Sequence, residues 1–248
     1  MTDNTKKFLG KADAYDKGRP NYSQDALFYM EKCGVNKNAV TADIGSGTGI
    51  LSKQLLDLEA EVYAVEPNEE MRAKAEKNLA GYAKFHSVSG SAENTLLNNH
   101  SIDFVTVAQA FHWFDPELFK NECRRILKPN GKIFLLWNNG IKAGDMRDEC
   151  YDLYEKYNPR DKKNSKNKDT EEAVQKFFKN FEAKKFDNEI TYNKETFVAY
   201  HLSISATLTP KDKEFKTFVS ELEDIFDKYQ KRGIIRTSCD TALYVGTI

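Results

Sequence analysis

The sequence has no long apolar run, no excess of charge of one sign and no leader-like N-terminus. Its longest strand-like apolar run, IFLLW at 133–137, is far too short to span a bilayer. Lysine and arginine number 37, against 38 aspartates and glutamates, so neither a polybasic nucleic-acid binder nor an acidic tail is expected. The stretch 1–15 lacks the apolar core of a signal peptide. These absences predict a cytoplasmic protein without nucleic-acid or membrane partners, and they leave its oligomeric state open.

Cysteine is also scarce. The four cysteines form no C-x-x-C pair, and none stands near a histidine at the spacing of metal ligands. Isolated cysteines of this kind are typical of reduced, partly buried thiols in a cytosolic protein. No metal site is therefore predicted.

The first 140 residues alternate strand-like and helix-like patterns. Strands are predicted at 39–44, 61–66, 84–90, 102–110 and 132–137, and helices at 50–58, 69–80 and from Pro116 onward. Asp115 before Pro116 supplies an N-cap and a proline at the first helical position. This alternation indicates a parallel sheet with helices on both faces.

After residue 140 the rhythm changes. The segment 160–169 is polar and largely basic, and no aromatic residues separate its charges. We interpret it as a solvated loop rather than a nucleic-acid patch for that reason. A helix from Glu171 is predicted to carry Val174, Phe177, Phe178 and Phe181 on one face. A long amphipathic helix is predicted after Pro210, and 241–248 is strand-like.

Alternate glycines follow the first predicted strand in the stretch TADIGSGTGI, 41–50. A P-loop is excluded because the chain has no G-x-x-x-x-G-K-[ST] pattern. A dinucleotide loop fits imperfectly, because Ile50 stands where G-x-G-x-x-G has its third glycine. Alternate glycines also let the backbone approach the ribose and methionyl parts of S-adenosylmethionine. Glu66, which ends the next strand, suits the ribose of either cofactor, so these residues leave both open.

Further along the chain, several stretches resemble, in order and spacing, the motifs of class I S-adenosylmethionine-dependent methyltransferases. They are DIGSGTG at 43–49, VYAVEPN at 62–68, GSAENT at 90–95, AQAFHWF at 108–114 and RILKPNGKI at 125–133. An ordered set of this kind is far more specific than one glycine loop. YDKGRPNYS at 15–23, taken with QAFHWFD at 109–115, resembles the small-molecule branch that includes the trans-aconitate methyltransferases.

The resemblance implies an α/β fold with a Rossmann-like, doubly wound, seven-stranded sheet, a reversed last strand and a mostly helical insertion. Residues 1–140 would form the S-adenosylmethionine-binding core with an N-terminal cover. Residues 141–232 would form the insertion that caps the substrate, and 233–248 the strand region that completes the sheet. The implied cofactor is S-adenosyl-L-methionine, and the implied partner is a small-molecule methyl acceptor.

Site residues follow from the matched motifs and their neighbours. Cofactor-binding roles are predicted for Tyr15, Arg19, Asp43, Gly45, Ser46, Gly47, Gly49, Glu66, Pro67, Asn68, Met71, Ala92, Glu93, Gln109 and Ala110. Substrate-binding roles are predicted for His112, Trp113, Trp137, Asn138, Tyr200 and His201, at strand ends or in the insertion. The resemblance gives Asp43 the task of orienting the loop or meeting the methionyl ammonium. His112 is either a general base or a hydrogen-bond donor, and no catalytic residue is assigned.

The sequence therefore predicts an S-adenosylmethionine-dependent methyltransferase of a small molecule, with O-methylation of a carboxylate as a compatible chemistry. Arg19 suits such a carboxylate, or the cofactor's own, because its planar fork binds both oxygens. Two alternatives stay open. A nicotinamide-dependent oxidoreductase is disfavoured by Ile50 and by the motifs after residue 90. A non-catalytic S-adenosylmethionine binder is not excluded, because no single residue is indispensable to methyl transfer.

Overall fold

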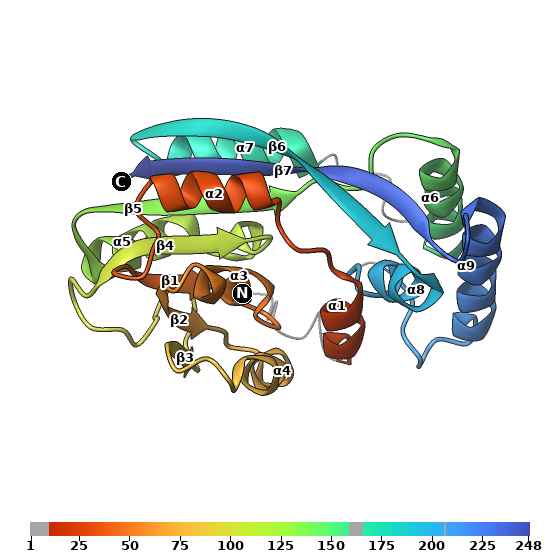
Figure 1. Cartoon of the computed structure of the whole chain (residues 1–248), viewed down its shortest axis with the longest axis horizontal. Coiled ribbons are helices and arrows are strands. Elements are labelled where there is room, and N and C mark those ends of the chain that lie inside the picture. The colour runs from red at the N-terminus through yellow and green to blue at the C-terminus, as the bar shows by residue number, and fades with distance from the viewer. Residues whose placement is uncertain (1–9, 159–165, 206) are drawn as a thin grey trace.

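A mixed seven-stranded sheet with the order β3-β2-β1-β4-β5-β7-β6 organises the chain (Figure 1). The computed structural model describes residues 10–158, 166–205 and 207–248. The strands are β1 (Val40–Ile44), β2 (Glu61–Val65), β3 (Phe85–Val88), β4 (Ile102–Ala108), β5 (Leu127–Asn138), β6 (Asn180–Tyr192) and β7 (Ile235–Thr247). All pairs from β3 to β5 are parallel, whereas β7 runs antiparallel to both β5 and β6. The predicted Rossmann-like sheet with a reversed last strand is confirmed.

Helices cover both faces of this sheet. They are α2 (Gln24–Lys32), α3 (Ile50–Asp57), α4 (Glu69–Leu79), α5 (Pro116–Ile126) and α7 (Lys166–Phe177). Apolar side chains of α2 and α3 form one buried cluster with the sheet, and those of α5 and α7 form another on the opposite face. Asp115 caps α5 by accepting hydrogen bonds from the backbone N–H groups of Glu117 and Leu118, an arrangement that contributes about 1 kcal/mol.

A third buried cluster lies beyond the sheet (Figure 1). It joins α6 (Asp145–Tyr157), α8 (Lys194–Leu202) and α9 (Phe215–Tyr229) to the end of β6 and the start of β7. Phe197, Phe218 and Phe226 are each at most 2% exposed there. We call α6, α8 and α9 the cap. The N-terminal helix α1 (Ala12–Gly18) packs between the cap helix α8 and the core helix α4.

Two details of the region after residue 140 differ from the sequence predictions. The region predicted as mostly helical also contributes β6, which pairs with β7 along its whole length. The predicted helix from Glu171 instead begins at Lys166 and ends at Phe177, so Phe178 and Phe181 lie beyond it. The polar loop predicted at 160–169 is therefore wrong from residue 166 onward, and 160–165 lie outside the described residues.

The strand register brings the candidate site together. Ile44 pairs with Val65, and Ala108 pairs with Leu136, so β1, β2, β4 and β5 end at the same edge of the sheet. Loops that follow parallel strands at this edge are where open α/β sheets bind ligands. The short 3-10 helix Phe111–Trp113 follows β4 at this edge.

Candidate functional site

The glycine loop between β1 and α3 has a backbone that requires glycine. Gly45, Gly47 and Gly49 have φ angles of 69°, 57° and 85°, in the left-handed region that side chains disfavour. A Cβ added to Gly45 would lie 2.7 Å from the Cβ of Ala110. The loop therefore lies directly against the segment that follows β4, and it leaves the backbone of Gly45 and Gly47 on the wall of a cleft.

Glu66 is fixed at the end of β2 by the two loops that flank it. Its Oε2 accepts a hydrogen bond from the backbone N–H of Gly47 at 2.9 Å, and its Oε1 accepts one from Asn68 at 2.8 Å. The residue is 8% exposed, and burial raises the pKa of its carboxyl group. Each carboxylate oxygen can accept more than one hydrogen bond, so Glu66 remains a suitable acceptor for a ligand's hydroxyl groups.

Asp43 lies beneath the glycine loop. It is 1% exposed, and its oxygens accept hydrogen bonds from the hydroxyls of Ser52 at 2.6 Å and Thr106 at 2.9 Å. Burial raises the pKa of this carboxyl group to about 6. These contacts tie β1 to α3 and β4, which is the geometry of a residue that orients the loop.

A cleft of about 540 Å³ opens at this edge of the sheet, and we call it the outer cleft. The predicted cofactor residues on its wall are Tyr15, Gly45, Gly47, Glu66, Pro67, Asn68, Met71, Ala92, Glu93, Gln109 and Ala110. Trp113, predicted to bind substrate, also lines it, together with Phe114 and Leu118, which lie outside the predicted set. The wall thus combines backbone, an acidic group and several apolar side chains, as small-ligand sites usually do.

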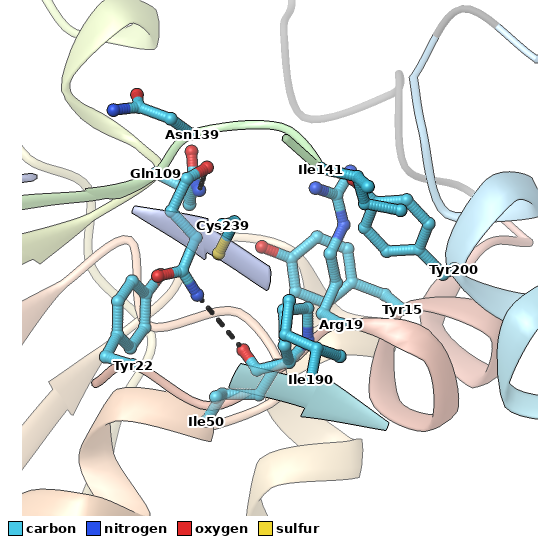
Figure 2. A pocket seen from close by; sticks show the side chains of 12 residues that line it. Tyr15, Arg19, Tyr22, Ile50, Gln109, Asn139, Ile141, Ile190, Tyr200 and Cys239 are labelled. Atoms are coloured by element: carbon cyan, nitrogen blue, oxygen red, sulfur yellow. Dashed lines mark hydrogen bonds between the residues drawn. The ribbon is translucent and has the colours of Figure 1, made fainter. Parts of the chain in front are cut away.

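A much smaller space of about 20 Å³, the inner cavity, lies against the cap (Figure 2). Its lining is Tyr15, Arg19, Pro20, Tyr22, Ile50, Gln109, Asn138, Asn139, Ile141, Ile190, Tyr200 and Cys239. Tyr15 and Gln109 line both spaces, so the inner cavity and the outer cleft adjoin at these two residues. The predicted residues Arg19, Asn138 and Tyr200 come together here.

Arg19 brings an unneutralised positive charge to the inner cavity. Its guanidinium carbon lies 5.2 Å from the ring centre of Tyr15 and 5.6 Å from that of Tyr200, as Figure 2 shows. Its Nε is buried without a hydrogen-bond partner, and its NH2 group donates to the carbonyl of Ser203 at 3.4 Å. No carboxylate of the described residues forms an ion pair with it. A partly buried cation in this state, with one buried N–H group left without an acceptor, favours an anionic ligand.

A hydrogen-bond network holds the opposite wall of the inner cavity. The side chain of Gln109 donates from Nε2 to the carbonyl of Asn138 at 2.7 Å. The Asn138 side chain donates to the carbonyl of Asn21 at 3.1 Å and accepts from the hydroxyl of Thr241 at 2.6 Å. These bonds join β5, β7 and the segment after α1, and they fix the wall that faces Arg19.

No group with a near-neutral pKa lines the inner cavity. Burial raises the pKa of the Tyr15, Tyr22 and Tyr200 hydroxyls, and it raises that of the Cys239 thiol to about 11. Guanidinium groups keep their proton at any ordinary pH. The described lining therefore offers hydrogen-bond donors and one cation, but no general base.

The structure does not bring three of the predicted substrate residues to either space. His112 is exposed and packs against Trp113, with ring centres 4.4 Å apart. Trp137 is 8% exposed and packs edge-on against Phe111 and Tyr244 in the core.

His201 is 2% exposed inside the cap. Its Nε2 lies 3.7 Å from the sulfur of Cys150, and its Nδ1 contacts the hydroxyl of Tyr154. Burial lowers its pKa to about 3, which makes the ring neutral at ordinary pH. His201 is thus part of the cap's interior.

The described residues hold neither a membrane-spanning helix nor a metal-binding cluster. None of the helices in the described ranges is both long and apolar enough to cross a membrane. Within the same ranges, histidine, cysteine, aspartate and glutamate side chains form no group of three or more that could hold a metal ion.

Part of the chain is similar to known methyltransferases. Residues 42–135 match the family model of a methyltransferase domain. An uncharacterized methyltransferase of Mycobacterium tuberculosis is 35% identical over 135 residues, which cover 53% of this chain and 51% of that protein. One from Schizosaccharomyces pombe is 32% identical over 147 residues, covering 57% and 56%. The chain thus spans about half the length of these curated relatives.

Among solved structures, a candidate type II methyltransferase of Anaeromyxobacter dehalogenans superposes with a TM-score of 0.69. The match covers 92% of this chain and 97% of that one at 22% identity. The chain therefore has the fold of class I methyltransferases, and its segment 42–135 is similar to their methyltransferase domain.

Proposed function

We propose that the protein is an S-adenosylmethionine-dependent methyltransferase that acts on a small molecule bearing a carboxylate. The observation that carries this proposal is the outer cleft: a methyltransferase-like segment places its glycine loop and a buried carboxylate, Glu66, on one wall. The adjoining inner cavity, with its unneutralised Arg19, supplies a place for the anionic acceptor.

The residues of the outer cleft fit S-adenosylmethionine. Glu66 would accept hydrogen bonds from the ribose hydroxyls, and the left-handed Gly45 and Gly47 let backbone approach the ligand. Met71 and Ala92 give the cleft an apolar wall suited to adenine. One oxygen of Glu93 accepts a hydrogen bond from the backbone N–H of Asp115 and so fixes the loop beside that wall.

S-adenosylmethionine supplies a methyl group on a sulfonium, which is already activated for in-line displacement. The chain's own task is then to hold the acceptor in line and to exclude water, and positioning of this kind can supply ~7–11 kcal/mol. Tyr15 and Gln109 stand at the junction of the two spaces. We assign them to the boundary across which the methyl group passes.

The acceptor's class follows from what lines the inner cavity. A carboxylate is ionised at neutral pH and needs no base, which matches a lining whose titratable groups keep their protons. Arg19 would pair with it through its guanidinium fork. The far wall comes from Ile141, Ile190 and Tyr200, and this supports the assignment of 141–232 as the substrate cap.

The test has two stages. Calorimetry should show binding of S-adenosylmethionine and S-adenosylhomocysteine but not of NAD. Turnover of labelled cofactor against panels of carboxylic acids, amines and phenols should then select carboxylic acids. Tighter binding of NAD would favour the oxidoreductase alternative, and cofactor binding without turnover on any panel would favour a non-catalytic binder.

Arg19→Met should lower kcat/KM for the carboxylic acid about 100-fold or more, because a charge-assisted pair is lost. Cofactor affinity should change little. Lys17→Met is the matched control, since Lys17 lies in α1 two residues before Arg19 and has an exposed side chain. If Arg19→Met instead abolishes S-adenosylhomocysteine binding, Arg19 serves the cofactor and the carboxylate proposal fails.

A further inference from the structure

The contact between α1 and the cap helix α8 is unusually close. A Cβ added to Gly18 would lie 2.1 Å from the backbone nitrogen of Tyr200, so only glycine allows the two backbones to meet there. On its other side α1 is joined to α4, where Lys74 pairs with Asp13 at 2.7 Å. Figure 1 shows α1 standing between core and cap. We call the contact between α1 and α8 the seam.

Lys11 stabilises one end of the seam through hydrogen bonds. The residue is 5% exposed, and its ammonium donates to the carbonyls of Leu202 at 3.2 Å, Ile204 at 2.6 Å and Thr207 at 3.0 Å. Leu202 ends α8, where the last carbonyls of a helix lack internal donors and its dipole favours a cation, and Ile204 and Thr207 lie in the segment that follows. The three donors of the ammonium are therefore all used to hold the C-terminal end of α8.

Arg19 binds the same turn from the other end of α1. Its guanidinium donates to the carbonyl of Ser203, which lies in the chain between Leu202 and Ile204, two of the three residues whose carbonyls Lys11 binds. Burial and the positive charge of Arg19 lower the pKa of Lys11 to about 8, so both groups are charged at neutral pH. The negative charge of Asp212 raises the pKa of Lys11 and partly offsets this lowering. Two like charges thus converge on one turn of backbone beside the inner cavity.

The inner cavity is too small to hold an acceptor in this arrangement. Its volume of about 20 Å³ suits about one water molecule, whereas the outer cleft is already open. An acceptor that contacts Arg19 and Tyr200 therefore needs part of the surrounding wall to move, and α1 and α8 form the part that carries these two residues. An anion that arrives at Arg19 offsets the repulsion between the two cations, which favours closing the seam again.

We propose that Lys11 is a positioning residue. Its hydrogen bonds to the carbonyls at the end of α8, which we call the latch, hold the seam closed and thereby keep Arg19 and Tyr200 around an anionic acceptor in the inner cavity. The role of Arg19 in this inference rests on the proposed function. Lys11 itself does not line either space, so it acts through α8 and not by contact with the acceptor. Loss of the latch should affect acceptor binding more than cofactor binding.

Hydrogen exchange of the apo and S-adenosylhomocysteine-bound protein tests the latch without an acceptor. Lys11→Met should speed exchange at the amides of Ser203 and Ile204 about tenfold or more, with β4 and β5 unchanged. Lys17→Met is the matched control, because its exposed pair with Glu195 crosses the same seam and surface pairs contribute little. Lys11→Arg, which keeps the cation, should restore part of the protection.

Kinetics on a carboxylic acid selected by turnover gives the second readout. Lys11→Met should raise KM for the acceptor about tenfold and leave KM for S-adenosylmethionine within about twofold. Unchanged exchange at Ser203, or equal acceleration in β4 and β5, would overturn the latch. An absence of methyl transfer would refute the proposed function instead, because the exchange result does not depend on it.

Discussion

Glu66 offers the sharpest test of the outer cleft. Glu66→Ala removes a carboxylate that is 8% exposed and accepts hydrogen bonds from the backbone of Gly47 and Asn68. The variant loses the proposed acceptor of the ribose hydroxyls together with the group that joins two loops. Both losses weaken the cofactor site, whereas the strand pairing of β2 does not involve the side chain.

The expected magnitude follows from the kind of bond that is lost. A hydrogen bond to a charged group contributes ~1.5–3 kcal/mol, so the dissociation constant for S-adenosylhomocysteine should rise about 10- to 150-fold. Isothermal titration calorimetry at neutral pH measures this change directly. Because burial raises the pKa of Glu66, wild-type affinity should also start to fall on acidification at a higher pH than an ordinary glutamate would predict.

A matched control separates this effect from a general change of charge. Glu69→Ala removes the same charge from an exposed position in the first turn of α4. It should leave the affinity within about twofold, as surface substitutions usually do. If Glu66→Ala binds S-adenosylhomocysteine as tightly as wild type, the carboxylate has no part in binding, and the assignment of the outer cleft to this cofactor loses its main support.

Two further variants test the interior and the surface of the site. His112→Gln should keep turnover within about twofold, because His112 lines neither the inner cavity nor the outer cleft. Turnover measured against pH checks this. A wild-type rate that depends on a histidine-like pKa, with that dependence lost in the variant, would contradict it. Asp43 has a pKa raised from 3.8 to about 6. Its protonated form therefore adds stability that is fully present below pH 3.8 and lost as pH rises through about 6, worth roughly 3 kcal/mol. Asp43→Asn should remove that dependence in denaturant titrations from pH 4 to 7, and identical profiles for both proteins would refute the buried-charge argument.

The core strands could be predicted because both their faces are buried. β1 and β4 are short apolar runs between turn signals, the pattern of a parallel sheet. β6 has no such pattern: its first half is exposed and rich in charge, and burial alternates only toward Tyr192. It is held mainly by its ladder with β7, and backbone pairing leaves little trace in side-chain type. The sequence therefore suggested helices where an edge strand lies.

The outer cleft and the inner cavity also differ in how much of each could be predicted from the sequence. The outer cleft is built from loops that directly follow consecutive strands, so local motifs were enough to name most of its wall. The inner cavity combines side chains from α1, β5, β6, α8 and β7, and Ile190 or Cys239 carry no local signal. His201 is the opposite case, a predicted site residue that lies in the interior of the cap. Only tertiary contacts show that Cys150 and Tyr154 enclose it.

The charges around the outer cleft and the inner cavity give a physical reason why a cationic cofactor and an anionic acceptor would bind side by side. In the outer cleft, burial raises the pKa of the Glu66 carboxyl, the positive charge of Arg72 opposes this and the negative charge of Asp43 adds to it, so a ligand cation beside the two carboxyl groups is favourable. Around the inner cavity Arg19 and Lys11 repel one another, so an anion is favourable.

The proposed reaction uses this separation. A carboxylate oxygen forms its bond to the methyl carbon with a lone pair, and the carbon–sulfur pair stays on sulfur. In such a transfer the sulfonium would become a neutral thioether and the carboxylate a neutral ester, so each product would lose the attraction that held its precursor. Release of both products is then favoured without a proton transfer. An ammonium acceptor would instead add another positive charge beside Arg19 and Lys11, and for this reason we favour carboxylic acids over amines.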